Sequence, residues 1–440
     1  MYYQRKIDNY LLSWKDDPYR KPLLIRGARQ VGKSSAVRHL GETFNHFIEI
    51  NLERDQDIKQ LFGANIDVKK ICIQLSAIKG IPIVPRQTLL FIDEIQESPR
   101  AISALRYFYE EYPELHVVAA GSLLEFTLRD IPSFGVGRIS SIYMYPFSFD
   151  EFLIASGDGM LESYKKNYGN YDHPLPAAMH SGLCEKLRTY YLVGGMPESV
   201  ARWIETSDYS GCAAIQRDII STYQDDFGKY NSRISSLALR NTLMSVARQA
   251  GCKFVYSMVE GDNGTTTVKK ALQLLTLAGL VIPVIHTAAN GIPLGAETNS
   301  KFIKYLILDT GLMQALLRIP PADILLSSSS DFVNKGAFSE VFAGLELLKY
   351  SSPYDQPQLY YWQRLSKGSQ AEVDYVTTDN TSRILPIEVK AGTRGSMQSM
   401  RIFMELKHLD SGIRVCMENF GRVNEISICP LYAISHIQRE

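Results

Sequence analysis

One eight-residue segment limits the folds open to this chain more than any other feature of its sequence. Residues 27–34 read Gly-Ala-Arg-Gln-Val-Gly-Lys-Ser and match the pattern G-x-x-x-x-G-K-[ST]. The segment follows PLLIRG, an apolar stretch that predicts a strand, and it precedes KSSAVRHLGETF, which predicts a helix. In that context the glycines let backbone N–H groups face an anion, and the N-terminus of the helix adds a favourable field. The sequence therefore predicts a phosphate-binding loop between a strand and a helix.

The loop and a second motif together predict a site for ATP and Mg²⁺. In loops of this pattern the lysine, here Lys33, reaches the β- and γ-phosphates, and the hydroxyl, here Ser34, ligates Mg²⁺. The apolar stretch LLFIDE ends in Asp93 and Glu94. We expect Asp93 to hold the Mg²⁺ shell and Glu94 to polarise the attacking water. The residues of the loop predicted to contact ATP are Gly27, Ala28, Arg29, Gln30, Val31, Gly32, Lys33, Ser34 and Ser35.

Two further side chains are candidates for the chemical step. The apolar stretch HVVAAGS predicts a strand that ends at Ser122, whose hydroxyl can orient the water or the γ-phosphate; a serine that only caps the next helix is an equal alternative. Arg138, in FGVGRIS, is a candidate for the arginine that neutralises charge in the transition state. A surface arginine explains Arg138 equally well, and Arg129 competes with it for the role.

The first 150 residues alternate strand-like and helix-like segments, which predicts a parallel sheet with helices on both faces. The fold class is therefore α/β. The chain carries 47 Lys and Arg against 47 Asp and Glu, and 45% of its residues are hydrophobic. The balance of charge excludes a strongly basic nucleic-acid-binding chain, and the apolar content excludes global disorder.

The pattern divides the 440 residues into four regions. Residues 1–155 form the predicted P-loop core, and residues 156–235 read as a helical connector. In residues 236–323, helices are followed by the apolar stretches LVIPVIHT and KYLILDT, which is the outline of a winged helix. A module that packs against the ATPase is an alternative to a DNA reader there. Residues 324–440 begin with a Ser-rich linker and continue with a helix and several strands.

The last region contains acids spaced like those of PD-(D/E)XK nucleases. The stretch AEVDYV places Asp374 on the same strand face as Glu372, and LPIEVKA places Glu388 beside Lys390. A hairpin would gather these groups, and two carboxylates can hold a divalent metal that activates water. Glu340, on the preceding helix, is a candidate for an additional acid. A solvent-facing ion pair across two strands is the alternative to this candidate nuclease site.

The chain resembles a known family of prokaryotic ATPases. The segments GARQVGKS, LLFIDEIQ, GRI, YPFSFDEFL and YYLVGGMPE are similar to those of AAA-type P-loop ATPases that carry a C-terminal DUF4143 domain. The resemblance implies an AAA-like core, a winged-helix middle and a restriction-endonuclease-like end. It also implies that GGMP contacts the adenine through Pro197, although a plain turn fits that segment too. Where relatives have Thr-Gly-Ser at the strand tip, this chain has Ala-Gly-Ser, so the sensor role rests on Ser122 alone.

Neither cysteine content nor hydropathy indicates secretion or a membrane. The six cysteines form no C-x-x-C pair, which predicts free thiols in a reducing compartment. Residues 271–296 carry no charge, but polar residues and Pro283 interrupt the apolar run, which therefore predicts a buried helix and strand. We expect a cytoplasmic protein.

Three functions remain open from the sequence. The first is a Mg²⁺-dependent ATPase coupled to DNA binding or cleavage by the nuclease-like domain. The second is a nucleotide-dependent switch or scaffold with an inactive nuclease fold. The third is an ATP-regulated DNA-binding protein that uses the winged helix. ATP is the predicted ligand in all three, and DNA and a second copy of the chain are candidate partners.

Overall fold

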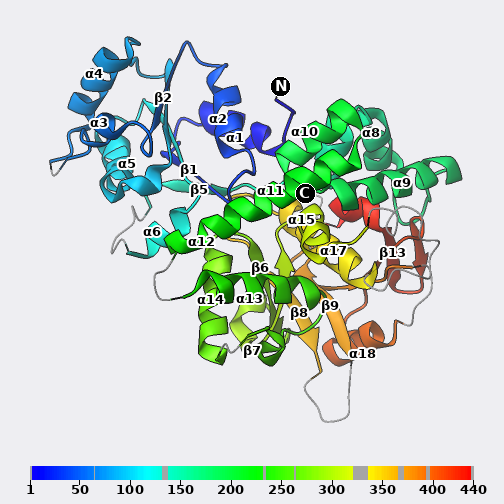
Figure 1. Ribbon diagram of the computed structural model, residues 1–440. Coiled ribbons are helices and arrows are strands. Elements are labelled where there is room, and N and C mark those ends of the chain that lie inside the picture. The colour runs from blue at the N-terminus through cyan, green and yellow to red at the C-terminus, as the bar shows by residue number, and fades with distance from the viewer. Residues whose placement is uncertain are drawn as a thin grey trace. The chain divides into compact units, whose positions relative to one another are not determined.

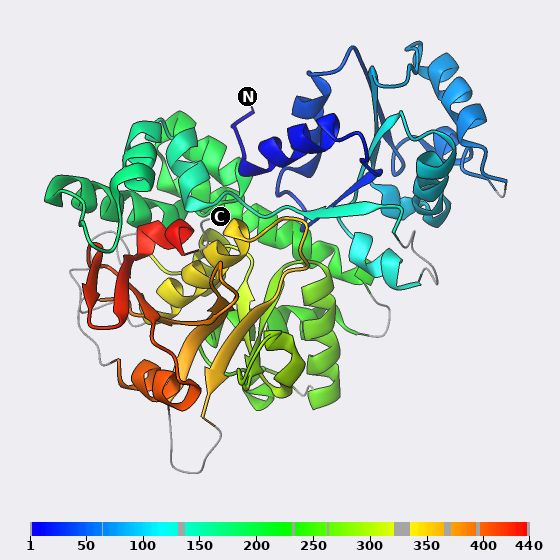
Figure 2. The same ribbon diagram turned by 180° about the vertical axis from the view of Figure 1, so that it is seen from behind.

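The computed structural model describes residues 2–63, 65–130, 137–230, 234–261, 264–320, 335–364, 371–392 and 397–437. The chain forms two compact units (Figures 1 and 2). The first unit comprises Met1–Tyr145, Leu277–Gly279 and Ser352–Gln356. The second comprises Pro146–Thr276, Leu280–Ser351 and Pro357–Glu440.

The first unit contains the parallel sheet that the alternating pattern predicts. Its strand order is β2-β3-β4-β1-β5, and every pair of neighbours is parallel. The strands are β1 (Leu23–Arg26), β2 (His46–Asn51), β3 (Thr88–Asp93), β4 (His116–Ala120) and β5 (Ser140–Tyr143). All residues of β3 and β4 are buried, as expected for strands covered on both faces.

Helices flank this sheet on both sides (Figures 1 and 2). One face packs alternate strand residues such as Leu90 and Ile92 against apolar residues of α4 (Val68–Lys79) and α5 (Pro99–Glu111). The other helices of this unit are α1 (Lys6–Asp16), α2 (Lys33–Gly41), α3 (Gln56–Lys59) and α6 (Leu124–Asp130). Helix α2 begins at Lys33, directly after the phosphate-binding loop, as the sequence predicts.

The second unit begins with a group of helices. They are α7 (Phe149–Ala155), α8 (Gly159–Tyr168), α9 (Ala177–Val193), α10 (Pro197–Thr206), α11 (Tyr209–Asp225), α12 (Phe227–Tyr230), α13 (Ser236–Arg248) and α14 (Thr265–Leu277). Three more follow later in the chain: α15 (Thr310–Leu317), α17 (Lys335–Tyr350) and α18 (Gln398–Lys407).

The second unit is built around one mixed sheet in the order β12-β13-β11-β10-β9-β8-β6-β7. Its strands are β6 (Val281–Thr287), β7 (Thr298–Ile307), β8 (Leu359–Gln363), β9 (Glu372–Thr378), β10 (Ile384–Val389), β11 (Gly412–Cys416), β12 (Gly421–Val423) and β13 (Ile426–Pro430). The hairpin β6–β7 falls in the region predicted to be a winged helix, and β8–β13 fall in the nuclease-like region. Because β6 pairs in parallel with β8, one continuous sheet joins the two regions.

Two predictions about buried segments are confirmed. Residues 271–296 contain the end of α14 and the strand β6, in place of a single apolar span. The six cysteines are free, and five of them are buried. Within the described residues, no helix is both long enough and apolar enough to cross a membrane.

Candidate nucleotide-binding site and acidic cluster

The phosphate-binding loop follows the carboxyl end of β1, and its backbone geometry requires glycine at its two ends. Gly27 has a φ of 139°, and a Cβ atom there would lie 2.2 Å from the carbonyl oxygen of Met144. Gly32, the N-cap of α2, has a φ of 99°. A side chain would clash at Gly27 and strain the backbone at both positions. The two glycines that the motif requires, Gly27 and Gly32, thus lie at positions where any other residue would strain the loop.

Lys33 lies folded back onto the loop. Its Nζ donates to the carbonyl oxygens of Gly27 at 2.8 Å and Ala28 at 2.6 Å, and only 7% of the residue is exposed. No ion pair joins Lys33 to another described residue. Burial lowers the pKa of Lys33 to about 8, although Glu94 and Asp93 oppose that shift. The ammonium is therefore held near the loop by hydrogen bonds to neutral carbonyls, and the carboxylates of Glu94 and Asp93 act on it without forming an ion pair.

The two acids at the end of β3 occupy different environments. Asp93 is 6% exposed and accepts a hydrogen bond from Ser34 Oγ to its Oδ2 at 3.0 Å. Burial raises the pKa of Asp93, and the bond from Ser34 offsets part of that shift. A hydroxyl and a carboxylate at this spacing are two of the oxygen ligands that Mg²⁺ accepts, with phosphate oxygens and water for the rest. These residues therefore fit the metal implied by the motif.

Glu94 is oriented by two neighbours. Its backbone is left-handed, with a φ of 49°. Its Oε2 accepts hydrogen bonds from Gln96 Nε2 at 2.5 Å and from Ser122 Oγ at 3.1 Å. Arg29 Nε in turn donates to Ser122 Oγ at 3.1 Å. The hydroxyl of Ser122 is thus turned toward Glu94. Gln96 is a second neighbour of the Glu94 carboxylate that the sequence reasoning missed, although it lies two residues after Glu94.

Arg138 lies at the other edge of the sheet. It precedes β5, whereas the loop follows the carboxyl end of β1, and β1 and β5 are parallel. Its Nε forms an ion pair with Glu110, at the end of α5. Arg138 is therefore not positioned to reach the phosphate-binding loop of its own chain. The side chain of the competing Arg129 lies outside the described part of the chain.

The GGMP segment connects α9 to α10 in the second unit. Gly194 has a φ of 68°, and the backbone N–H of Gly195 donates to Oδ2 of the buried Asp309 at 2.6 Å. A Cβ atom at Gly195 would lie 2.3 Å from the carbonyl oxygen of Phe147. Pro197 is the first residue of α10. Local packing explains both glycines, and the contact of Pro197 with adenine stays a prediction.

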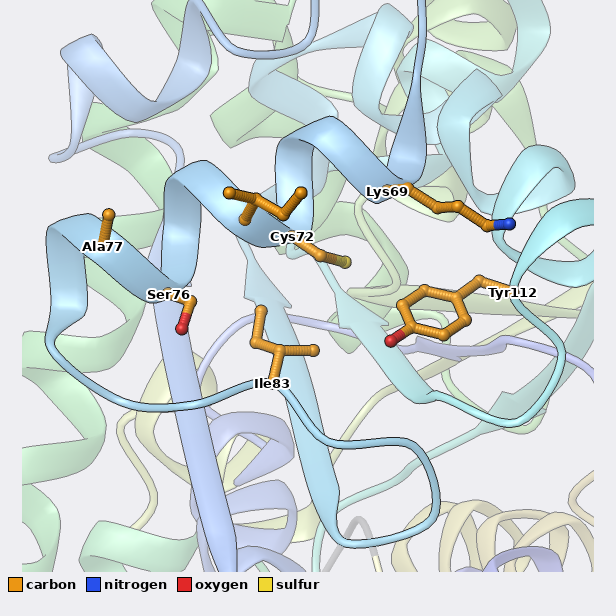
Figure 3. Close-up of a pocket in the computed structure, with 7 residues that line it drawn as sticks. Lys69, Cys72, Ser76, Ala77, Ile83 and Tyr112 are labelled. Atoms are coloured by element: carbon orange, nitrogen blue, oxygen red, sulfur yellow. The ribbon is translucent and has the colours of Figure 1, made fainter.

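One pocket of the first unit is separate from this loop. It has a volume of about 510 Å³ and is lined by residues that include Lys69, Cys72, Ile83 and Tyr112 (Figure 3). Ile83 precedes β3 and Tyr112 precedes β4, so the pocket lies near the amino ends of these strands. Burial raises the pKa of Cys72 to about 12, which leaves its thiol unreactive. The pocket therefore does not compete with the phosphate-binding loop for the nucleotide.

The acids of the candidate nuclease site do come together in the second unit. Strands β9 and β10 are antiparallel, with Tyr375 opposite Ile387. Asp374 Oδ2 accepts a hydrogen bond from the backbone N–H of Val389 at 2.7 Å, and Lys390 Nζ lies 2.7 Å from Glu388 Oε1. We use the name acidic cluster for Glu340, Glu372, Asp374 and Glu388.

A lysine that the sequence reasoning missed lies among these acids. The Nζ of Lys304, on β7, is 2.8 Å from Glu340 Oε1 and 2.5 Å from Glu372 Oε1. The available signal was a lysine inside the otherwise apolar stretch FIKYLIL. Among the residues that the structure describes, no three His, Cys, Asp or Glu side chains are arranged to hold a metal ion.

Family models match three parts of the chain. Residues 19–153 match the model described as an AAA domain, and residues 335–434 match a domain of unknown function, DUF4143. Residues 184–323 match another domain of unknown function, DUF8612. The chain thus carries an AAA-type P-loop ATPase domain followed by a DUF4143 domain, and the resemblance noted from the motifs is confirmed. No curated protein matches the chain.

Three solved structures are distantly similar in fold. The Walker-type ATPase PABY2304 of Pyrococcus abyssi is 15% identical, with 72% of this chain and 96% of that chain covered and a TM-score of 0.44. The Aeropyrum pernix ORC1 protein in complex with DNA is 12% identical (74% and 95% covered, TM-score 0.29). The S. cerevisiae Hsp104–ADP complex is 16% identical (62% and 38% covered, TM-score 0.29). At these TM-scores the likenesses do not extend to function.

Proposed function

We propose that the first unit binds ATP with Mg²⁺ and hydrolyses it. The observation that carries this proposal is the state of Lys33. A buried ammonium is costly unless it is paired with an anion, yet the hydrogen bonds of Lys33 go to carbonyl oxygens of its own loop, and it forms no ion pair with a described residue. The triphosphate of ATP would supply the missing charge at the N-terminus of α2, where backbone N–H groups also face the ligand.

The neighbouring polar groups support the hydrolytic part of the proposal. Ser34 and Asp93 would hold the Mg²⁺, which neutralises charge on the phosphates when it is bound. Glu94 would accept a proton from water, and its carboxylate is already oriented by Gln96 and Ser122. Orientation before the substrate arrives reduces the entropy lost on reaching the transition state.

We further propose that Arg138 acts on the nucleotide of a second copy of the chain. Its place at the amino edge of the sheet separates it from the loop of its own chain. Its partner Glu110 is a surface carboxylate, and the two side chains are 40% and 30% exposed. An exposed ion pair is weak, so Arg138 can exchange this contact for a phosphate at little cost.

Turnover and nucleotide binding test the assignment of the two central residues. We expect Glu94→Gln to retain ATP binding while hydrolysis falls by about 10²- to 10⁴-fold, the range typical of a lost general base. Lys33→Ala should lose both. A matched control is Glu97→Gln, because Glu97 pairs with Lys59 and lies only three residues from Glu94. If the Glu94→Gln variant hydrolyses ATP at the normal rate, Glu94 is not the general base.

For the second unit, the geometry favours a scaffold over a DNA-processing enzyme. The hairpin β6–β7 is incorporated in the eight-stranded sheet, where β6 pairs with β8, instead of projecting as a free wing. We therefore propose that this unit is a scaffold that does not cut DNA. Incubating the protein with linear, plasmid and single-stranded DNA, with Mg²⁺ or Mn²⁺ and with or without ATP, tests this. Cleavage that Asp374→Ala and Lys390→Ala both abolish would establish the nuclease instead.

A further inference from the structure

Lys304 is a cation in a place where a protein does not normally leave one. It lies on β7, where the partly buried Ile303 precedes it and the buried Tyr305 and Leu306 follow it. Only 1% of Lys304 is exposed. Its ammonium lies 5.0 Å from the centre of the Tyr361 ring. Removing an ammonium from water costs several kcal/mol unless charged groups surround it. The position therefore requires counter-charges inside the second unit.

The acidic cluster supplies those counter-charges. The Nζ of Lys304 lies 2.8 Å from Glu340 Oε1, 2.5 Å from Glu372 Oε1 and 3.9 Å from Asp374 Oδ1. Three carboxylates on two elements, α17 and β9, thus converge on one ammonium. Burial alone would lower the pKa of Lys304, but Glu340, Asp374 and Glu372 raise it overall, so the lysine is charged.

An ammonium and a divalent metal cannot share this point. Mg²⁺ binds carboxylate oxygens at about 2.0–2.1 Å. The carboxylate oxygens of Glu340 and Glu372 already lie within hydrogen-bond distance of Nζ. Lys304 is part of the strand β7, so its backbone position is fixed by the sheet. A metal placed between the same two oxygens would meet the ammonium at contact distance, with strong repulsion between the two cations.

The other half of the acidic cluster is partly committed as well. Asp374 Oδ2 accepts the N–H of Val389 at 2.7 Å, and Glu388 Oε1 faces Lys390 Nζ at 2.7 Å. Glu388 Oε2 is the buried carboxylate oxygen of this half that has no hydrogen-bond partner among the described residues. One such oxygen beside the ammonium of Lys390 is a poor substitute for the several hard ligands that a divalent metal needs.

We propose that the ammonium of Lys304 takes the place of the divalent metal that the nuclease-like pattern implies, so that the acidic cluster binds no metal and the second unit cleaves no DNA. The cluster instead ties β7, α17 and β9 together. The metal implied by the spacing of Asp374, Glu388 and Lys390 does not fit the surrounding residues. This inference is independent of ATP hydrolysis by the first unit.

Binding of Mn²⁺ by the full-length protein without nucleotide tests the proposal. All variants carry Asp93→Asn, which removes the carboxylate of the other metal site, and Mn²⁺ is followed by its electron paramagnetic resonance. We expect no Mn²⁺ bound to this background protein at the acidic cluster. Adding Lys304→Met should raise Mn²⁺ affinity at least tenfold, and Glu340→Gln should then abolish that gain. Lys301→Met, an exposed lysine on the same strand, is the matched control and should gain nothing.

Two results would overturn the proposal. One is Mn²⁺ binding by the background protein that Asp374→Asn removes, because the cluster would then hold a metal with Lys304 in place. This measurement uses only proteins that retain Lys304, so it does not depend on the folding of any Lys304 variant. The other is a Lys304→Met protein that shows the circular dichroism of the parent yet binds no Mn²⁺, because the lysine would then not be occupying a metal position.

Discussion

Two buried lysines in this molecule, Lys33 and Lys304, show opposite electrostatic environments. Lys33, in the first unit, contacts two neutral carbonyl oxygens, and burial lowers its pKa to about 8. Lys304, in the second unit, is surrounded by three carboxylates that raise its pKa. The two differ little in exposure, at 7% and 1%. The two buried lysines therefore differ in their partners: hydrogen bonds to carbonyl oxygens for Lys33, and carboxylates for Lys304.

The same substitution at both lysines tests this contrast most strongly. Lys304→Met leaves three carboxylates without a cation, so we expect the free energy of unfolding to fall by about 3–5 kcal/mol, as when one partner of a buried ion pair is removed. Lys33→Met removes a buried charge that forms no ion pair with a described residue, so the free energy of unfolding should stay within about 1 kcal/mol of the parent. Denaturant titration at neutral pH measures both. If both variants lost the same free energy of unfolding, the two lysines would not differ in their electrostatic environments as described.

The pH dependence of ATP affinity is the next largest effect. With a pKa of about 8, Lys33 of the free protein loses its proton as the pH rises through 8, whereas bound phosphates favour the protonated form. ATP affinity should therefore fall up to tenfold per pH unit above 8, and binding near pH 8 should take up a fraction of a proton. Calorimetry in buffers of different ionisation enthalpy measures the uptake.

The matched control for that experiment is Lys33→Arg, whose guanidinium stays protonated throughout this range. Its affinity for ATP, although weaker, should not change between pH 8 and pH 10. If the ATP affinity of Lys33→Arg fell with pH as steeply as that of the parent, the titrating group would not be Lys33. The same shift also bears on stability: the unfolded lysine binds its proton more tightly than the folded one, so the stability contributed by this residue rises with pH above about 8.

A smaller effect is expected at Gln96, which sharpens the description of the ATP site. Gln96→Leu removes the 2.5 Å hydrogen bond to Glu94 Oε2. Since Gln96 acts through Glu94, kcat should fall by about tenfold, roughly one charged hydrogen bond, with KM for ATP unchanged. Gln87→Leu is the control, because Gln87 bonds to the exposed Asn45. A rise in KM without a change in kcat would mean that Gln96 binds nucleotide.

The juxtaposition of the residues proposed to bind ATP could be predicted from the sequence because they are local in sequence or lie at strand ends. The loop occupies eight consecutive residues. Asp93 ends β3 and Glu94 follows it, and β3 pairs with β4, the strand that Ser122 follows. Parallel strands bring their carboxyl ends to one edge, so the strand pattern alone places these groups together. The edge that carries Arg138 follows from the same rule once β5 is known to be parallel to β1.

The acidic cluster could be predicted only in part. The hairpin β9–β10 follows from two apolar stretches and a turn, and it gathers Asp374 with Glu388. Lys304 could not be found in this way, because β7 is separated from β9 in the sheet by β6 and β8. Its contact with Glu340 spans 36 residues of sequence. A lone lysine in an apolar strand signals a buried charge, but not which acids surround it.

The sequence by itself therefore determined an AAA-type P-loop domain, the place in the fold of the residues predicted to act on ATP, and the acids of the second unit. These features depend on short-range spacing, which backbone geometry converts directly into position. Only the tertiary structure decided that Gln96 and Ser122 contact the Glu94 carboxylate, that β6 and β7 join the sheet of the second unit, and that Lys304 pairs with acids of the acidic cluster. Those outcomes depend on which charges become neighbours when distant strands pack, because electrostatic energy at short range and low dielectric outweighs any local preference.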